Sequence, residues 1–457
     1  MLSFVGLCLL LGFGHLLRMK IRLLQRLYLP SCVIAGLVGL AILQIAQYTG
    51  HPLPEDWTLG WSKLPGILIN VVFACLFLGV KLPKFRSLAR RAGPQLAYGQ
   101  VVAWGQYVVG IGLFMLVVSR FWPELPAMFA AIIPVGFEGG HGTAGGLEGT
   151  FDKLGWSAGK DFGLASATVG IVSAIIVGMA LVNWAARRGY TVRKQGPADI
   201  PEDDSFGVIP VDQRPPAGRL TVRSDAVEAF SLHLVVVGVA VGIGYLLHYG
   251  LVVLAGAIGN ETFLKIATSF PKFPLCMIGG LIVQICEDKF DRHQLIDLGL
   301  MRRIQNTSLD FLVVAAVATI RLTALAEGWV PFVMICVAGI LWNVLCVLVL
   351  ARWMLPNAWF ERSIAEMGQS MGVTATGLVL LRVVDPDAKT PAMDAFASKQ
   401  LLHEPFMGGG LWTSAAIPLL AAWGARPVFL IACGAVATWL VIVASVKLAI
   451  RSKRTAA

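Results

Sequence analysis

The chain has 457 residues, of which 56% are hydrophobic and only 14% are charged, and its formal net charge is +10. Soluble globular domains carry about 25% charged residues, so this composition excludes an ordinary soluble protein and predicts a polytopic membrane protein. The Lys and Arg residues occur in short runs between apolar segments, which favours loops on one side of a membrane over nucleic-acid binding.

Three further features limit the possible functions. Arg18 and Lys20 follow the first apolar run, whereas a cleavable secretory signal carries its positive charge before that run. The eight cysteines lie in or beside apolar runs without a C-x-x-C spacing, which predicts packed thiols and neither a zinc site nor disulfides. The sequence contains no G-x-x-x-x-G-K-[ST] or H-E-x-x-H motif, so we expect a protein that is not an enzyme and has no organic cofactor.

Eleven apolar runs predict membrane-spanning helices. A spanning helix needs about 20 residues, so the first run is marginal, and the seventh is interrupted by SFPKFP. The runs lie at residues 2–17, 28–47, 64–80, 96–118, 161–184, 229–256, 263–286, 308–326, 330–351, 402–424 and 427–450.

Two further apolar segments, at about 124–150 and 363–385, contain too many glycines and polar groups to face lipid. If the eleven runs span and these two do not, every basic cluster falls on one side, with the N-terminus outside and the C-terminus cytoplasmic. The clusters are Arg18–Arg26, Lys81–Arg91, Arg187–Lys194, Lys289–Arg303 and Arg451–Arg454. The two segments are therefore predicted to be re-entrant hairpins, because non-helical backbone at membrane depth survives only inside protein or beside a wet cavity.

The two halves of the chain resemble each other weakly. NVVFACLFLGVKL (70–82) and DFLVVAAVATIRL (310–322) correspond at a shift of 240, and GFEGGHGTAG from Gly136 and GQSMGVTATG from Gly368 share G-x3-G-x4-G at a shift of 232. The sequence thus predicts an all-α polytopic membrane protein with two inverted five-helix repeats, each with a re-entrant glycine-rich hairpin, and one extra C-terminal helix. Inverted repeats with interrupted helices are typical of secondary transporters, whose site lies near the membrane midplane.

The predicted organisation has four parts. The first transmembrane repeat occupies 1–184, a cytoplasmic linker occupies 185–228, the second repeat occupies 229–426, and a further helix with a basic tail occupies 427–457.

The hairpins are the candidate site. Glycine turns leave backbone groups uncovered, and a short helix directs its unpaired amides and the positive end of its dipole at a carboxylate ahead of it. Carbonyl and Thr oxygens suit a hard cation such as sodium. Side-chain donors and ligands would come from Thr143, Gln369, Ser370, Thr374 and Thr376. The alternative is that the glycines only permit close helix packing, but packing does not explain Glu138 and His141 beside them.

Individual polar residues allow more than one interpretation. Glu138 is a candidate for binding a cation or carrying a proton, or it lies at the aqueous mouth. His141 is a candidate for substrate contact or pH sensing, or it is a structural histidine. Asn70 and Asp310 each begin a predicted helix, so they are either N-caps or sodium ligands together with Thr143 and Thr374.

At these motifs the chain resembles the bacterial glutamate:sodium symporter family. The resemblance rests on GGHGTAGGLEGTF (139–151), GVKLPKFRSLARRAG (79–93) and, less closely, GQSMGVTATG. It implies an inner-membrane, multi-pass symporter that takes up glutamate with sodium, forms a homodimer and moves an elevator-like core. It also implies site residues Gly139, Gly140, His141, Gly142 and Thr143 in the first hairpin, and Gly372, Thr374 and Thr376 in the second.

The chain also departs from the family pattern. Glu138 stands in place of a small polar residue, and Ala375 stands where a proline is expected. The linker and the last helix are additional. We therefore keep three alternatives to a sodium-coupled glutamate symporter: a carrier of another organic anion or amino acid, a different coupling ion, and a passive channel.

Overall fold

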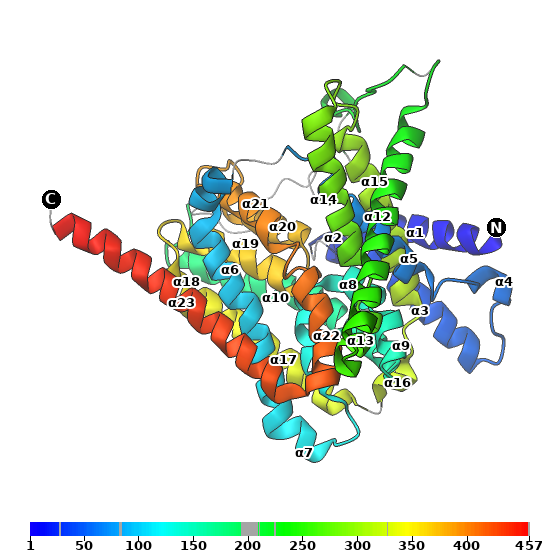
Figure 1. The fold of residues 1–457 in the computed structure, drawn as a ribbon, viewed down its shortest axis with the longest axis horizontal. Coiled ribbons are helices and arrows are strands. Elements are labelled where there is room, and N and C mark those ends of the chain that lie inside the picture. Colours follow the sequence, from blue (N-terminus) through cyan, green and yellow to red (C-terminus); the bar gives the residue numbers. More distant parts are fainter. Residues whose placement is uncertain are drawn as a thin grey trace. The chain divides into compact units, whose positions relative to one another are not determined.

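The computed structural model describes residues 1–26, 29–81, 85–192, 209, 211–223, 225–326 and 328–455. All regular elements in these residues are helices, as Figure 1 shows, so the predicted all-helical class is confirmed. Residues 193–208, 210 and 224 of the predicted linker at 185–228 lie outside the described residues, and they include its acidic stretch at 197–204.

The chain divides into two compact units, and each unit takes segments from both halves of the sequence. Unit 1 comprises Met1–Leu82, His141–Leu164 and Pro201–Arg321. Unit 2 comprises Pro83–Gly140, Ala165–Ile200 and Leu322–Ala457. The division into 1–184, 185–228, 229–426 and 427–457 stays a prediction.

Unit 1 has a core where four helices meet. Buried side chains of α5, α12, α14 and α15, among them Ala74, Val237, Cys276 and Met301, form one hydrophobic cluster. The helices of unit 1 are α1 (Leu2–Lys20), α2 (Arg22–Arg26), α3 (Ser31–Tyr48), α4 (Glu55–Thr58), α5 (Leu64–Ala74), α9 (Glu148–Lys153), η5 (Val211–Gln213), α12 (Ala229–Ile258), α13 (Glu261–Ser269), α14 (Phe273–Phe290) and α15 (Leu298–Ala318).

Unit 2 contains the glycine-rich segments and the last helix. Its helices are α6 (Phe85–Leu113), η1 (Phe114–Val118), α7 (Ser119–Phe121), η2 (Ala127–Ala131), η3 (Pro134–Glu138), α16 (Leu322–Ala326), α17 (Trp329–Leu345), η6 (Cys346–Leu350), α18 (Ala351–Met354), α19 (Trp359–Met371), α20 (Thr374–Val384), α21 (Ala392–His403), α22 (Leu411–Trp423) and α23 (Ala425–Thr455). The helix α8 (Gly140–Gly146) begins at the unit boundary, and α10 (Ala158–Arg187) continues across it. In the core, Val443 of α23 packs with Tyr98 and Val101 of α6.

Seven helices of the described chain are long and apolar enough to cross a membrane, or eight if the bent pair α13–α14 forms one span. The predicted eleven spans are therefore not confirmed. The run at 64–80 forms the short helix α5 and then turns, with Gly79 at a φ of +74°. The run at 308–326 is interrupted after Ala318, and the SFPKFP interruption coincides with a 72° bend between α13 and α14.

Several structural features recur at the spacing of the two glycine motifs. The π-helical turns η1 and η6 begin at Phe114 and Cys346, which are 232 positions apart. The elements that open the two glycine-rich segments, η2 and α19, begin at Ala127 and Trp359, again 232 positions apart. The same spacing relates Gly136 and Gly368 in the sequence.

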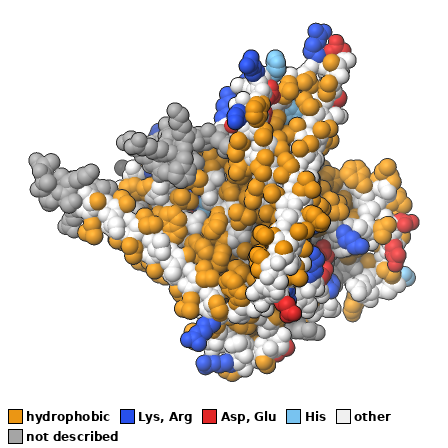
Figure 2. Space-filling model, in the orientation of Figure 1, with side chains coloured by type: hydrophobic (Ala, Val, Ile, Leu, Met, Phe, Trp, Pro, Cys, Tyr) orange, Lys and Arg blue, Asp and Glu red, His pale blue; other side chains and the backbone are white. Residues whose placement is uncertain are grey.

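The surface is apolar over much of α12. Figure 2 shows hydrophobic side chains covering this helix, and its exposed residues include Val235 at 62%, Leu246 at 70% and Leu254 at 55%. Monomeric soluble proteins rarely expose a continuous apolar surface of this kind, and lipid is its natural solvent. The surface of α12 thus agrees with a membrane protein.

Substitution of Gly36, which lies at the contact between α3 and α15, tests the packing of unit 1. A Cβ on Gly36 would lie 2.6 Å from Cβ of Val317, whereas one on Gly12 in α1 would meet nothing within 4 Å. We expect Gly36→Ala to destabilise the protein by about 1–3 kcal/mol through overpacking. Gly12→Ala serves as the control and should not destabilise it, because Ala is the better helix former. Thermal unfolding in detergent measures both, and equal midpoints for the two variants would contradict this packing.

Candidate functional site

The first glycine-rich segment forms a short helical limb that ends in a break. Pro134 begins the π-helical turn η3, and Gly139 ends it. Gly140 then begins α8 with a φ of +68°, in the left-handed region that residues with a Cβ rarely adopt. Single π-helical turns are frequent at functional sites. The two residues of the break have no side chains to cover their N–H and C=O groups.

The second segment has the same construction. The helix α19 ends at Met371, Gly372 and Val373 form the break, and α20 begins at Thr374. Thirteen residues of α-helix are about 20 Å long, so α19 alone is too short to cross the hydrocarbon core. Because Val373 has an apolar side chain, no side-chain cap covers the N-terminus of α20.

The glycines of the shared motif have two roles. A Cβ on Gly136 would lie 2.6 Å from a side chain of α10, and one on Gly368 would lie 2.7 Å from Cα of Gly377 in α20. These glycines allow close helix packing, which was one interpretation of the sequence. The middle glycines, Gly140 and Gly372, lie at the breaks. Packing and break formation therefore apply to different glycines of one motif.

The two breaks lie beside each other within unit 2. A Cβ on Gly140 would lie 3.4 Å from Cγ1 of Val373 and 3.7 Å from the carbonyl oxygen of Gly372. Because Gly140 has no side chain, nothing from this residue separates the backbone of the first break from the backbone of the second.

A fully buried lysine connects the side chains around these breaks. Lys399 in α21 donates to Oε1 of Glu366 at 2.6 Å, of Gln369 at 3.0 Å and of Gln400 at 3.0 Å. The side chains of Lys399 and Glu366 are both 0% exposed. An ammonium group has three N–H donors and no acceptor, so these three oxygens satisfy it completely.

Lys399 also fixes the direction of two amides. Because the ammonium only donates, both glutamine side chains turn their oxygens toward it and their NH2 groups away. Gln369 then donates from Nε2 to Oε1 of Glu138 at 2.9 Å, and Gln400 donates to Oγ1 of Thr374 at 2.6 Å. Lys399 thereby connects the residue before the first break with the first residue of α20.

Glu138 has a second hydrogen-bond partner, His403, and the side chains of both residues are buried. Its Oε1 also lies 2.5 Å from Nε2 of His403 in α21, and both side chains are 0% exposed. Its Oε2 has no hydrogen-bond partner among the residues that the structure describes. The hypothesis that Glu138 lies at an aqueous mouth is therefore wrong for this arrangement.

The helix α6 supports the network from a third side. Gln95 donates to Oε2 of Glu366 at 2.8 Å, and Gln106 donates to the carbonyl oxygen of Ser370 at 2.6 Å. A Cβ on Gly99 would lie 2.6 Å from Cε of Lys399, so a glycine is needed where α6 passes the buried ion pair.

The structure brings many, but not all, of the predicted site residues together. Those in unit 2 are Glu138, Gly139, Gly140, Gln369, Ser370, Gly372, Thr374 and Thr376. Those in unit 1 are His141, Gly142, Thr143, Asn70 and Asp310. His141 is 2% exposed, and Thr143 is 1% exposed, with no hydrogen-bond partner for its Oγ1 among the described residues.

Asn70 and Asp310 do not begin helices, so the N-cap interpretation is wrong. Asn70 lies inside α5, where its amide donates back to the carbonyl oxygens of Gly66 and Ile67. Asp310 lies inside α15, which starts at Leu298 after its cap Asp297, and it is hydrogen-bonded to Cys32. Their role as sodium ligands stays a prediction.

Sequence reasoning missed most of the network around Lys399. The missed residues are Gln95, Gln100, Trp104, Gln106, Glu366, Lys399, Gln400 and His403. One signal was available, since Lys399 and His403 lie four positions apart on one helix face, and so do Glu366 and Ser370. Ionisable side chains in an apolar environment indicate function by default.

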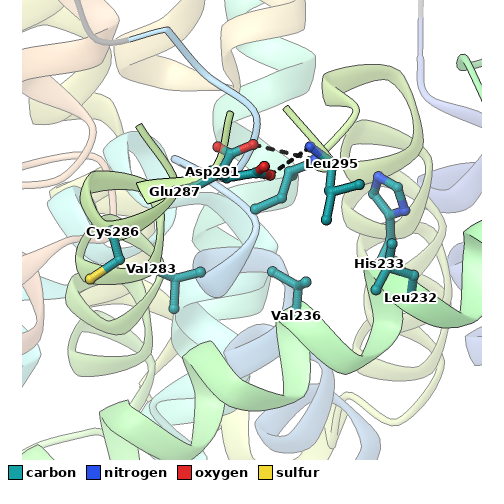
Figure 3. A pocket seen from close by; sticks show the side chains of 9 residues that line it. Leu232, His233, Val236, Val283, Cys286, Glu287, Asp291 and Leu295 are labelled. Carbon is teal, nitrogen blue, oxygen red and sulfur yellow. Dashed lines mark hydrogen bonds between the residues drawn. The ribbon is translucent and has the colours of Figure 1, made fainter. Parts of the chain in front are cut away.

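A separate pocket of about 310 Å³ lies in unit 1 between α12 and α14 (Figure 3). Its carboxylates are engaged locally: Asp291 accepts from the N–H groups of Leu295 and His293, which lowers the pKa of its carboxyl below the ordinary value. Glu287 accepts from the N–H of Ile296. The pocket contains none of the predicted site residues, and both ring nitrogens of His233 in its wall are engaged by backbone groups, so we do not assign the site there.

A buried network of charges beside two helix breaks, in a chain with membrane-length apolar helices, defines a membrane transport protein. A family model described as sodium/glutamate symporter matches residues 1–385. The chain belongs to the sodium/glutamate symporter family, as the sequence motifs predicted. The matched range ends before α21, which carries Lys399 and His403.

Comparison with curated proteins and with solved structures finds no significant match to this chain. Family membership makes the protein a transporter rather than an enzyme. The family match and the apolar helices together confirm a multi-pass membrane protein.

Removal of the buried lysine tests the network. Lys399→Met leaves the Glu366 carboxylate buried without its cation, which costs about 3–5 kcal/mol of unfolding free energy. The double variant Lys399→Met/Glu366→Gln should recover most of that loss, because it removes the unpaired charge. Thermal unfolding in detergent compares them with Lys389→Met, which breaks an ion pair whose side chains are each 65% exposed and should change nothing measurable. A double variant as unstable as the single one would contradict a charge-pairing role for Lys399.

Proposed function

We propose that this protein is a sodium-coupled secondary symporter that takes up a small carboxylate, most directly glutamate, by alternating access. Membership in the sodium/glutamate symporter family supports the cargo and the coupling ion. The observation that carries the proposal is the meeting of the two breaks, at Gly140 and Gly372, beside the buried network of Lys399.

The breaks supply what a carboxylate needs. The N-terminus of α20 carries the positive end of a helix dipole and has no side-chain cap, and Gly140 leaves adjacent backbone uncovered. Substrate carboxylate oxygens would accept hydrogen bonds from these amides. Gln369 and Ser370, one turn before the second break, would orient the rest of the cargo.

Sodium requires oxygen ligands, and two predicted ligands offer them. Oγ1 of Thr374 accepts a hydrogen bond from Gln400 and keeps a further lone pair. Thr143 brings a buried hydroxyl without a described partner. A cation bound at Thr374 would lie beside the substrate site, so its charge would offset that of the carboxylate and permit the loaded carrier to move.

The mechanism follows from the two-part construction. Unit 2 contains both breaks and the complete Lys399 network, and it is compact in itself. An elevator-like cycle, in which such a core moves with its cargo, needs a site that travels as one body. The recurring spacing of 232 positions supports the two inverted repeats, with one extra helix, α23, packed on α6.

The same proposal includes the setting of the protein. The family supports a bacterial inner membrane, and the basic clusters favour an N-terminus outside and a cytoplasmic C-terminus. A homodimer completes the proposed assembly. Another organic anion or amino acid is the alternative cargo, because Glu138 adds a negative charge beside Gly140.

Uptake by the purified protein in proteoliposomes tests the function. With an inward sodium gradient we expect concentrative uptake of glutamate in preference to aspartate and dicarboxylates, and saturable counterflow without single-channel current. Glutamate uptake that proceeds equally well without sodium would contradict the proposed coupling.

The hydroxyl of Thr374 gives a sharper test of the ion site. Thr374→Val keeps the shape but removes one ligand and leaves the Gln400 amide without its acceptor, a loss of about 1–3 kcal/mol. We expect the sodium concentration for half-maximal uptake to rise by about 5- to 150-fold, which is that loss converted to a ratio of affinities. Thr438→Val in α23, whose hydroxyl only bonds the carbonyl of Gly434, is the control and should behave as the parent protein. An unchanged sodium dependence in Thr374→Val would remove this residue from the ion site.

A further inference from the structure

The network around Lys399 has more carboxylates than cations. Glu138 and Glu366 each carry a negative charge when ionised, and among the residues that the structure describes Lys399 carries the one positive charge that faces both. If His403 is neutral, the buried group has a net charge of −1. An uncompensated charge in a water-excluded site is costly, so the group can take up one more positive charge when a donor that stabilises the carboxylates withdraws.

The hydrogen bonds show that His403 is neutral in this arrangement. The indole Nε1 of Trp104 only donates, and it lies 3.0 Å from Oε1 of Gln100. The NH2 group of Gln100 therefore faces Nδ1 of His403, at 3.3 Å. Nδ1 must then accept, and the ring carries its proton on Nε2, where it donates to Oε1 of Glu138.

The remaining proton site is the other oxygen of Glu138. Its Oε1 already accepts from Gln369 and His403, and both of these donors are fixed by groups behind them. Its Oε2 is buried and has no hydrogen-bond partner among the described residues. A proton on Oε2 would neutralise the group and leave both bonds to Oε1 in place.

We propose that Glu138 is a proton-binding site of the transport cycle, with Oε2 as the protonated atom and Gln369 as the residue that couples protonation to the second hairpin. This inference rests on the proposed transport function. No covalent bond changes; one proton is taken from one compartment and released to the other. The protein would thus transport a proton together with sodium and the substrate.

The surroundings of Glu138 favour a proton over a second sodium ion. The groups that face its carboxylate are N–H donors, from Gln369, His403 and the ammonium of Lys399, whereas sodium requires oxygen ligands. The other titratable groups near it are Glu366 on α19, Glu404 directly after α21, and Tyr107 on α6. Glu404 is the one carboxylate of these that the charge sum above does not include, and when ionised it adds negative charge, which strengthens the demand for a proton.

Gln369 supplies the coupling because it belongs to the second hairpin. It lies in α19, three positions before Gly372, and its N–H stabilises the ionised form of Glu138. When α19 moves and withdraws this donor, the carboxylate retains a less compensated charge and binds a proton. By reciprocity, protonation weakens the contact between the hairpins.

The test uses the full chain in proteoliposomes with equal sodium on both sides and the membrane potential clamped at zero. With one proton per glutamate, an inward gradient of one pH unit should accumulate glutamate about tenfold at steady state. Glu138→Gln should show no accumulation under this gradient. The accumulation ratio at steady state depends on the coupling stoichiometry and not on the transport rate. A variant that transports slowly therefore still gives a valid result. Glu148→Gln, which removes a carboxylate paired with Lys160 in unit 1, should retain the tenfold ratio.

Infrared spectroscopy of the purified protein in detergent gives a readout that does not require transport. Acidification should produce a protonated-carboxyl band that is missing in Glu138→Gln and persists to higher pH in Gln369→Leu, where the stabilising donor is lost. Sodium-driven glutamate uptake without accumulation under the pH gradient would overturn the proton proposal alone. The absence of any glutamate transport would overturn the proposed function, and the infrared band, present or missing in the Glu138 variant, would then decide the proton site.

Discussion

The arrangement of unit 2 depends on one buried ammonium group and its three acceptors. Lys399 has no lone pair, so each oxygen within its reach must turn toward it. This single constraint directs the Gln369 amide to Glu138 and the Gln400 amide to Thr374. Two hairpin segments that are more than two hundred residues apart in the chain are thus held by one side chain from a third element. Because Lys399 and Glu366 are both fully buried, either one alone would be a strongly destabilising charge.

The breaks and the network complement each other. Gly140 and Gly372 provide uncovered backbone, whose dipoles suit an anion, while the side chains around Lys399 set the charge of the space beside it. Neither part is sufficient for a selective carrier. Backbone N–H groups can donate to many different carboxylates and do not select among them. A network of side chains that bond only one another binds no cargo. Under the proposed function, their combination in one compact unit would give a site whose charge balance depends on what is bound, as coupling requires.

Local sequence patterns predicted the breaks, because a glycine-rich break depends mainly on residues within one short segment. Gly140 and Gly372 are at the helix breaks, as the shared motif suggested, and Gln369 and Thr374 contact the network beside them. The all-helical class and the interruption at SFPKFP likewise follow from local composition. The family was also found from residues in these motifs.

The exact starts of the helices, their interruptions and the long-range partners of Lys399 could not be predicted from local sequence patterns. Asn70 and Asp310 were expected to begin helices, but α5 starts at Leu64 and α15 starts behind Asp297, whose carboxylate accepts from the N–H of Leu300. Apolar runs do not report where a helix breaks, so the eleven predicted spans are not confirmed by the helices of membrane length in the described chain. The partners of Lys399 lie on helices far apart in sequence, and no periodicity within one segment places Gln95 and Glu366 together.

The central claim is that cargo binds where the two breaks meet, beside the Lys399 network. The most direct measurement is an experimental structure of the full chain in lipid nanodiscs with sodium and glutamate. The account predicts ligand density with its carboxylate against the N-terminus of α20 and the backbone of Gly140. Glutamate bound in the pocket between α12 and α14, or anywhere away from these two breaks, would contradict it.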